Sequence, residues 1–196
     1  MKIEKLKDLI ETKESIIFDF DGVLADSVNI KKDAFAQLYS KYGKKIKNKV
    51  IKHHLEHGGI SRFEKIKYYH NEFLKKKIND DELKLLCDNF SKLVINKVIE
   101  APEINGAGKF LSEMNKKNKS LFINTGTPTS EINIILEKKN LHKYFEDIFG
   151  SPGTKIENTD IIMKKYKFNA SESLFFGDSI EDLESADYFK ITKKIV

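Results

Sequence analysis

The organisation of this chain follows from one stretch, Ser15-Ile16-Ile17-Phe18-Asp19-Phe20-Asp21-Gly22-Val23-Leu24-Ala25-Asp26-Ser27. Its first four residues carry no charge and run directly into two aspartates spaced two apart, which a glycine follows. A short apolar run that ends in a turn signal predicts a buried strand of the kind found in parallel sheets. Asp19 and Asp21 would then lie at the carboxyl end of that strand, where open α/β sheets bind their ligands.

Two carboxylates in this position need a compensating charge. In a mostly apolar setting Asp19 and Asp21 would repel each other unless a cation or a shared proton lay between them. Oxygen ligands of this kind suit Mg²⁺. Gly22 lets the chain turn away where a Cβ would obstruct it. Two aspartates alone could also simply mark the end of a strand, so the metal site needs support from the rest of the chain.

Length and composition limit the class of protein. With 196 residues the chain can form one domain, or one domain with a sizeable insert. Cys87 is the only cysteine, so we expect a small buried group on a helix and a reducing compartment. No apolar run is long enough to span a bilayer, and Met1–Glu14 lacks the apolar segment of a signal peptide. These features predict a cytoplasmic protein that does not enter a membrane.

The net charge of +5 raises the question of nucleic acid binding. Lysines are distributed along the whole chain among 30 acidic residues, and Arg62 is the only arginine. Bidentate recognition of bases and phosphates usually depends on arginine. The basic character therefore indicates a solvated lysine surface, and we expect no nucleic acid partner.

Residues 27–100 form a block in which only helical periodicity is found. Apolar residues recur three and four apart, and Ser61-Arg62-Phe63-Glu64 has the form of a capping box. We therefore expect an inserted helical cap at 27–100 and a core built from 1–26 and 101–196. A short helix before the first strand is also predicted, from the spacing of Ile3, Leu6, Leu9 and Ile10.

Apolar runs followed by polar loops recur in the second half of the chain. They predict strands at Ser120–Ile123, Glu146–Phe149, Leu174–Phe176 and, last, Tyr188–Ile191. With helical segments between them, these strands predict a parallel sheet with right-handed crossovers. The expected fold class is therefore α/β, with a Rossmann-like parallel sheet core and an inserted all-helical cap.

The loops that follow the predicted strands carry the groups that phosphoryl transfer needs: carboxylates, a hydroxyl with backbone amides, and an amine. They are Asp19 and Asp21, Thr125 and Gly126, Lys155, and Asp178 and Asp182. In a parallel sheet all of them would face one crevice, and positioning with charge neutralisation carries most of this chemistry. Taken singly, Thr125 and Asp178 could cap the helices that follow them, and Lys155 could be a surface lysine.

In this order the motifs resemble those of the haloacid dehalogenase-like phosphohydrolase superfamily. Asp19–Ser27 is similar to its first motif, Thr125 to its second, Lys155 after Gly150-Ser151-Pro152 to its third, and Gly177–Asp182 to its fourth. The helical block lies between the first and second motifs, where one branch of the superfamily carries a helical cap. That branch includes phosphoglycolate phosphatase-like enzymes and β-phosphoglucomutase.

The resemblance implies a catalytic role for both aspartates of the first motif. Asp19 would attack phosphorus in line and form an aspartyl-phosphate. Asp21 would protonate the leaving oxygen and then take a proton from the hydrolytic water. An aspartate at position 21 favours a phosphatase or a phosphomutase, because the dehalogenases of the superfamily lack this second acid and its transport ATPases carry threonine there.

The resemblance also implies a metal site and a phosphate site. Mg²⁺ would bind Asp19, the backbone carbonyl of Asp21 and Asp178. Asp182 would not bind the ion directly: it would support these ligands or bind the ion through water. Phosphoryl oxygens would be held by Thr125 and the amides that begin at Gly126. Lys155 would neutralise phosphate charge and keep Asp19 ionised.

The cap carries a further group of polar residues. The spacing of His53, His54 and His57, with no cysteine or carboxylate at a set ligand distance, does not predict a zinc site. Arg62 follows the Gly58-Gly59 turn at the start of a helix and is a candidate contact for an anionic or sugar substrate. The alternative for Arg62 is a solvent-facing helix start.

We therefore expect a Mg²⁺-dependent phosphatase that acts on a small phosphorylated metabolite, such as a sugar phosphate, and is a monomer or a homodimer. A phosphomutase of the β-phosphoglucomutase type stays open, because the sequence does not separate the two reactions. A phospho-aspartate signalling module without turnover is a further alternative, although receiver domains carry no helical insert after their first strand.

Overall fold

The computed structural model describes residues 8–196, and a five-stranded sheet lies at its centre. Its strands are β1 (Ser15–Phe18), β2 (Ser120–Pro128), β3 (Asp147–Ser151), β4 (Ser173–Gly177) and β5 (Thr192–Ile195). The order across the sheet is β3-β2-β1-β4-β5, and every neighbouring pair is parallel. The strand that precedes Asp19 is therefore central, and the carboxyl ends of the strands lie along one edge.

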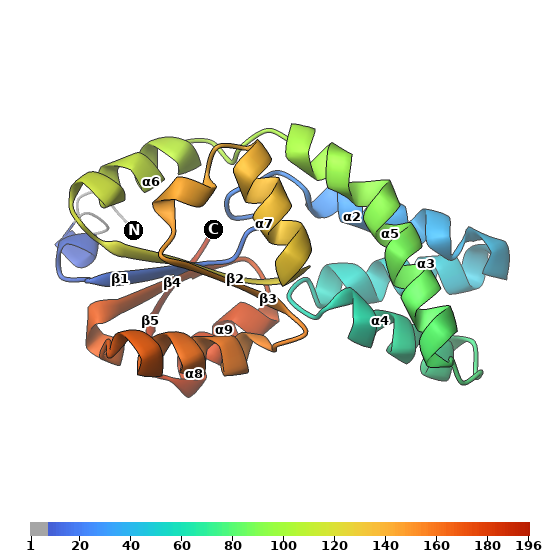
Figure 1. Cartoon of the computed structure of the whole chain (residues 1–196). Coiled ribbons are helices and arrows are strands. Elements are labelled where there is room, and N and C mark those ends of the chain that lie inside the picture. Colours follow the sequence, from blue (N-terminus) through green and yellow to red (C-terminus); the bar gives the residue numbers. More distant parts are fainter. Residues whose placement is uncertain (1–7) are drawn as a thin grey trace.

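Helices cover both faces of the sheet (Figure 1). They are α6 (Ala107–Lys116) and α7 (Thr129–Lys138) on one face, and α8 (Lys155–Tyr166) and α9 (Ile180–Tyr188) on the other. Successive residues of a strand point to opposite faces, so Ile16 and Phe18 belong to one apolar cluster and Ile17 to another. Because both faces are buried, these strands appear in the sequence as continuous apolar runs.

The segment between β1 and β2 forms the cap, at the right of Figure 1. Its α-helices are α2 (Val28–Leu38), α3 (Gly43–Glu56), α4 (Arg62–Tyr68) and α5 (Asp80–Glu100), with 3₁₀ and π turns at Ser40–Tyr42 and Tyr69–Phe73. No strand occurs between residues 28 and 100, and the interior is apolar, with Phe35, Val50, Ile66 and Phe90 buried. The predicted fold class, a Rossmann-like parallel core with an inserted helical cap, is confirmed.

The strand predicted at Tyr188–Ile191 is wrong. α9 continues to Tyr188, and the chain then turns through Lys190, whose φ is 57°. Ile191 is buried because it packs into the apolar cluster beneath the sheet. The strand itself, β5, follows at Thr192–Ile195, where alternate residues are exposed and two are lysines. An edge strand of this kind carries no apolar run that a sequence pattern could reveal.

The end of β2 differs from the sequence prediction, and the start of α8 sets the position of Lys155. β2 continues to Pro128, with an irregular register after Asn124. α8 begins at Lys155 because Thr154 caps it in both directions: its hydroxyl accepts from the amide of Glu157, and the carboxylate of Glu157 accepts from the amide of Thr154. Lys155 therefore lies in the first turn of a capped helix, which fixes the direction of its backbone.

The helix predicted ahead of β1 falls partly outside the described residues. Residues 8–11 are helical, whereas Ile3 and Leu6 are not described. Cys87 is buried on α5, as expected. Within residues 8–196, no helix combines the length and the apolar character needed to cross a membrane.

Candidate active site

The carboxyl edge of the sheet brings the predicted residues together around Lys155. Its Nζ lies 2.9 Å from Oδ1 of Asp19 and 2.7 Å from Oδ1 of Asp182. It also donates a hydrogen bond to the carbonyl oxygen of Asn124 at 2.6 Å. All four residues are buried. The alternative of a surface position for Lys155 is therefore wrong, and residues that follow three different strands meet at one point.

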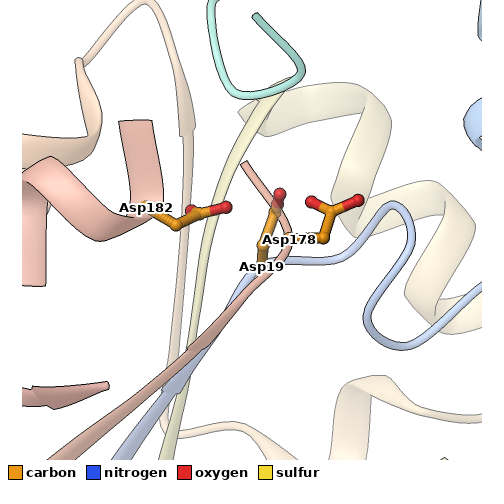
Figure 2. Close-up of side chains that lie close together, drawn as sticks. All are labelled: Asp19, Asp178 and Asp182. Atoms are coloured by element: carbon orange, nitrogen blue, oxygen red, sulfur yellow. The ribbon is translucent and has the colours of Figure 1, made fainter. Parts of the chain in front are cut away.

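Three carboxylates form the one group in the described residues that could hold a metal ion. Oxygens of Asp19, Asp178 and Asp182 all lie within 4.8 Å of one another, and Figure 2 shows the three side chains directed into the same space. Asp182 is already engaged, because its Oδ1 pairs with Lys155 and its Oδ2 accepts from Ser179 Oγ at 2.7 Å. Asp19 and Asp178 are therefore more available than Asp182 to bind a metal ion. Carboxylate oxygens of this kind suit Mg²⁺.

The protein alone does not balance the charges of this group. Burial raises the pKa of Asp19 to about 7; Lys155 opposes this effect, and the neighbouring carboxylates add to it. Asp178 is exposed on one side, but the surrounding residues desolvate it in part, and this effect and the charge of Asp182 raise its pKa to about 6. Burial would lower the pKa of Lys155, but Asp182 and Asp19 outweigh it and raise that pKa. A divalent cation would supply the positive charge that the carboxylates still need.

Gly22 turns the chain between the first motif and the cap. Its φ is +81°, and a Cβ built on it would lie 2.1 Å from Oδ2 of Asp178. Any side chain here would strain the backbone and displace a candidate metal ligand. The prediction that Gly22 stands where a Cβ would obstruct the chain is confirmed.

The carboxylate of Asp21 is held by three donors that the sequence analysis did not identify. It accepts hydrogen bonds from Ser27 Oγ at 2.6 Å and Thr127 Oγ1 at 3.1 Å, and it forms an ion pair with Lys31 of α2. Burial would raise the pKa of Asp21, but Lys31 and these hydrogen bonds outweigh it and lower the pKa. Nothing in the sequence distinguishes Lys31 from the many other lysines.

Thr125 and Gly126 lie beneath the cap. Thr125 is buried, and its Oγ1 accepts from the amide of Thr127 at 3.3 Å. A Cβ built on Gly126 would lie 2.6 Å from the carbonyl oxygen of Gly59, in the loop between α3 and α4. Glu181 ties the same loop to the core, because its carboxylate accepts from the amide of Gly59 at 3.0 Å. The cap loop is therefore in contact with the predicted phosphate loop.

We expect Gly126→Ala to lower kcat/KM by about 100-fold, because the new Cβ would push the cap loop away and small misplacements near reacting groups cost about this much. Steady-state kinetics measures the effect. Gly58→Ala is the matched control, since its Cβ would lie 3.4 Å from Ser179, which is an ordinary contact. Equal activity of the two variants would show that the close approach of the cap loop is not needed for catalysis.

Two cavities meet at the junction of cap and core. The smaller has a volume of about 30 Å³, and Asp19, Asp21 and Thr125 contribute to its wall from the core. The larger has a volume of about 310 Å³, shares both aspartates with the smaller one and extends to Asp178. The two predicted catalytic aspartates therefore line a small space under the cap and a wider one beside it.

Arg62 is buried, so the alternative of a solvent-facing helix start is wrong. Its guanidinium donates to both carboxylate oxygens of Glu131 on α7, at 2.6 and 2.9 Å, and to Ser91 Oγ at 2.6 Å. It also lies over the ring of Phe90, 4.6 Å from the centroid. Arg62 lines the smaller cavity, but Glu131 already neutralises its charge. Contact with substrate stays a prediction for Arg62, and its ion pair joins cap to core.

We expect Glu131→Gln to lower the free energy of unfolding by about 3 kcal/mol, because it leaves Arg62 as an uncompensated buried charge. Urea denaturation followed by circular dichroism measures the change. The double variant Arg62→Met/Glu131→Leu should lose clearly less, since apolar replacement of both partners is often tolerated. A double variant less stable than the single one would contradict this account of the pair.

The cap histidines belong to no cluster of three or more metal-binding groups within residues 8–196. The rings of His53 and His57 pack together with centroids 4.5 Å apart. His57 Nδ1 lies 3.0 Å from Oε1 of Glu181, so it adds a second contact between the cap loop and α9. Burial lowers the pKa of His53 to about 4. These two histidines therefore take part in packing and in the contact between cap and core.

Solved structures share this architecture. β-Phosphoglucomutase from Clostridium difficile superposes with a TM-score of 0.77 and 20% identity, covering 92% of this chain and 83% of that one. A predicted phosphoglycolate phosphatase from Haemophilus somnus superposes with a TM-score of 0.72 and 17% identity, covering 94% of this chain and 84% of that one. At these identities the likeness shows the fold.

Sequence comparison identifies the family. A curated phosphoglycolate phosphatase from Psychrobacter arcticus is 26% identical over 182 residues, which cover 87% of this chain and 77% of that protein. The family model described as haloacid dehalogenase-like hydrolase matches residues 16–196. This match begins in β1 and includes all four motifs that meet at the carboxyl edge of the sheet. The chain therefore belongs to the haloacid dehalogenase-like hydrolase family, as the motifs predict.

Proposed function

We propose that this enzyme is a Mg²⁺-dependent phosphatase that hydrolyses a small phosphorylated metabolite through an aspartyl-phosphate on Asp19. The meeting of Lys155 with Asp19 and Asp182, beside Asp178, carries the proposal. It provides a buried nucleophilic carboxylate, a fixed positive charge and carboxylate oxygens for a cation. These are the groups that stabilise a transferred phosphoryl group.

The proposed ligands of Mg²⁺ are Asp19, Asp178 and the backbone carbonyl of Asp21. When bound, the ion would neutralise charge on the phosphoryl group. Asp182 would act behind these ligands, because its carboxylate is occupied by Lys155 and by Ser179.

In the first step Asp19 attacks phosphorus, the bond from phosphorus to the ester oxygen breaks, and Asp21 gives its proton to the leaving oxygen. In the second step water attacks the phosphorus of the aspartyl-phosphate, Asp21 accepts the proton, and inorganic phosphate leaves with Asp19 regenerated. Thr125 and the amides from Gly126 onward would bind phosphoryl oxygens, and Lys155 would keep Asp19 ionised. The lowered pKa of Asp21 suits its role as the base of the second step, and the negative charge of a bound phosphoryl group would raise that pKa and favour the protonated form that the first step requires.

A small substrate is favoured by the site itself. The cap loop contacts the phosphate loop, and the two catalytic aspartates line spaces of about 30 and 310 Å³ between cap and core. The relatives are named a phosphoglycolate phosphatase and a β-phosphoglucomutase. Short phosphorylated acids and sugar phosphates are therefore the substrates to test first.

A screen of phosphorylated metabolites for release of inorganic phosphate tests the proposal. We expect release with Mg²⁺, none in EDTA, and full recovery when Mg²⁺ is returned. Product analysis with a hexose phosphate identifies the phosphomutase alternative, which would give an isomerised sugar phosphate and no free phosphate. Slow loss of a phosphoryl label from Asp19, with no release of inorganic phosphate from any metabolite, would instead support a signalling module.

A further inference from the structure

Lys65 of α4 is a buried cation that has no ion-pair partner among the described residues. Its side chain is 2% exposed. Its Nζ donates to Nδ1 of His54 at 3.0 Å and to the carbonyl oxygen of Gly58 at 3.2 Å, both neutral acceptors. Within residues 8–196, Lys65 forms no ion pair with a carboxylate. An ammonium group has three N–H donors, so one N–H donor of Lys65 is left for a ligand.

The other cations around the same cavity are already neutralised. Lys31 is paired with Asp21, and Arg62 is paired with Glu131. Lys31, Arg62 and Lys65 all line the smaller cavity. Burial of an unpaired charge is costly unless something compensates it. Of these three cations, only Lys65 lacks an ion-pair partner in the described residues. Its charge is therefore available to a bound group.

His54 gives a second, independent sign of a missing acceptor. It is 5% exposed, and burial together with Lys65 lowers its pKa far below the usual range, so the ring is neutral. Because Nδ1 accepts from Lys65, the proton of the neutral ring lies on Nε2. This buried Nε2 has no hydrogen-bond partner within the described residues. His54 and Lys65 thus each hold an unused donor beside the same cavity.

The shape of the cavity limits the group that these donors can bind. Its volume of about 30 Å³ holds two or three groups of the size of water. This suits the oxygens of a carboxylate, whereas a sugar ring would have to occupy the larger cavity that shares Asp19 and Asp21. Phe35 and Phe90 supply apolar walls, while Asp19 and Thr125 line the same space on the core side. A group bound to Lys65 would therefore belong to a molecule whose phosphoryl group lies at Asp19.

We propose that Lys65, assisted by His54, determines substrate specificity by binding the carboxylate of a short phosphorylated hydroxy acid. The inference rests on the proposed function, since it concerns the leaving group of that reaction. A two- or three-carbon acid would keep its carboxylate under the cap and its phosphate at Asp19. Sugar phosphates, which carry neutral hydroxyls in this position, would leave Lys65 unpaired and would be poor substrates.

The electrostatics of Lys65 agree with this role. Burial and then the charge of Lys31 lower the pKa of Lys65 to about 7, against the opposing charges of Glu181, Asp21 and Asp19. A bound carboxylate would stabilise the protonated ammonium.

The test compares three phosphate monoesters: 2-phosphoglycolate, the phosphate ester of glycolamide, and glucose 6-phosphate. The first two differ only in that a neutral amide replaces the carboxylate. We expect the wild-type enzyme with Mg²⁺ to favour the acid over the amide by about 100-fold in kcat/KM. Lys65→Met should remove this preference, because it raises KM for the acid much more than KM for the amide. Lys67→Met, at an exposed position on the same helix, should leave the preference intact.

A second measurement keeps the inference testable if a variant folds poorly or turnover is absent. Calorimetric titration of the Asp19→Asn variant with 2-phosphoglycolate and with the amide measures binding without hydrolysis, and about 100-fold tighter binding of the acid supports the role of Lys65. Equal affinity or equal kcat/KM for acid and amide in the otherwise intact protein would overturn it. Absence of phosphate release from all three substrates, with tight binding of the acid, would reject the proposed hydrolysis and leave the carboxylate subsite standing.

Discussion

Replacing Asp19 with asparagine is expected to lower kcat by about 10⁴-fold or more, because the amide cannot attack phosphorus and form the covalent intermediate. The carboxylate that is lost is buried and lies 2.9 Å from Lys155. The substitution keeps the shape of the side chain, and Lys155 retains Asp182 and the carbonyl of Asn124 as partners. The thermal midpoint should therefore not fall appreciably.

Phosphate release in single-turnover and steady-state assays measures the effect of Asp19→Asn, and circular dichroism verifies the fold. Asp26→Asn is the matched control, because Asp26 belongs to the same motif but is exposed. It should retain wild-type activity. Full activity of Asp19→Asn would reject the assignment of Asp19 as the nucleophile.

Lys155→Met is expected to lower the free energy of unfolding by about 3–5 kcal/mol, because it leaves two buried carboxylates without their shared cation. Asp19 and Asp182 would then face each other and Asp178 across a few ångströms. Activity should also fall, by about 100- to 1,000-fold, since the positive charge beside the phosphoryl group is lost. Urea denaturation in EDTA measures the stability.

The same variant also tests the metal site. Mg²⁺ should recover part of the lost stability of Lys155→Met, and it should stabilise this variant more than the wild type, because binding to the folded state alone shifts the equilibrium. Lys164→Met, on the same helix but with a side chain 75% exposed, should change the stability by no more than about 0.5 kcal/mol. A Lys155→Met protein as stable as this control would contradict the account of a buried charge cluster.

The sequence determined the central strand, the all-helical cap and the position of the four motifs. Buried parallel strands need apolar residues on both faces, so Ser15–Phe18 and Ser120–Ile123 are recognisable as short uncharged runs. Their carboxyl ends share one edge of the sheet. This is why Asp19, Lys155 and Asp182 could be expected to meet although they are far apart in the chain.

Only the tertiary structure decided which polar side chains pair with one another. Lys31 and Thr127 meet Asp21 across α2 and β2, and Arg62 meets Glu131 from a distance of 69 residues. Such pairs leave no periodic pattern, because each needs one contact and no repeated face. The edge strand β5 was missed for a related reason, since its exposed lysines hide the alternation that marks a strand.

The lack of an ion-pair partner for Lys65 is also something that only the tertiary structure decided. Whether a lysine is paired, exposed or buried without a partner depends on every element that packs around it, and Lys65 contacts residues from α3 and from the loop that follows it. Local sequence sets the chemical type of a side chain and the periodicity of its neighbours. The balance of charges in a closed cavity depends on charged groups from segments that are far apart in the sequence. Only the folded chain brings these groups together and so determines that balance.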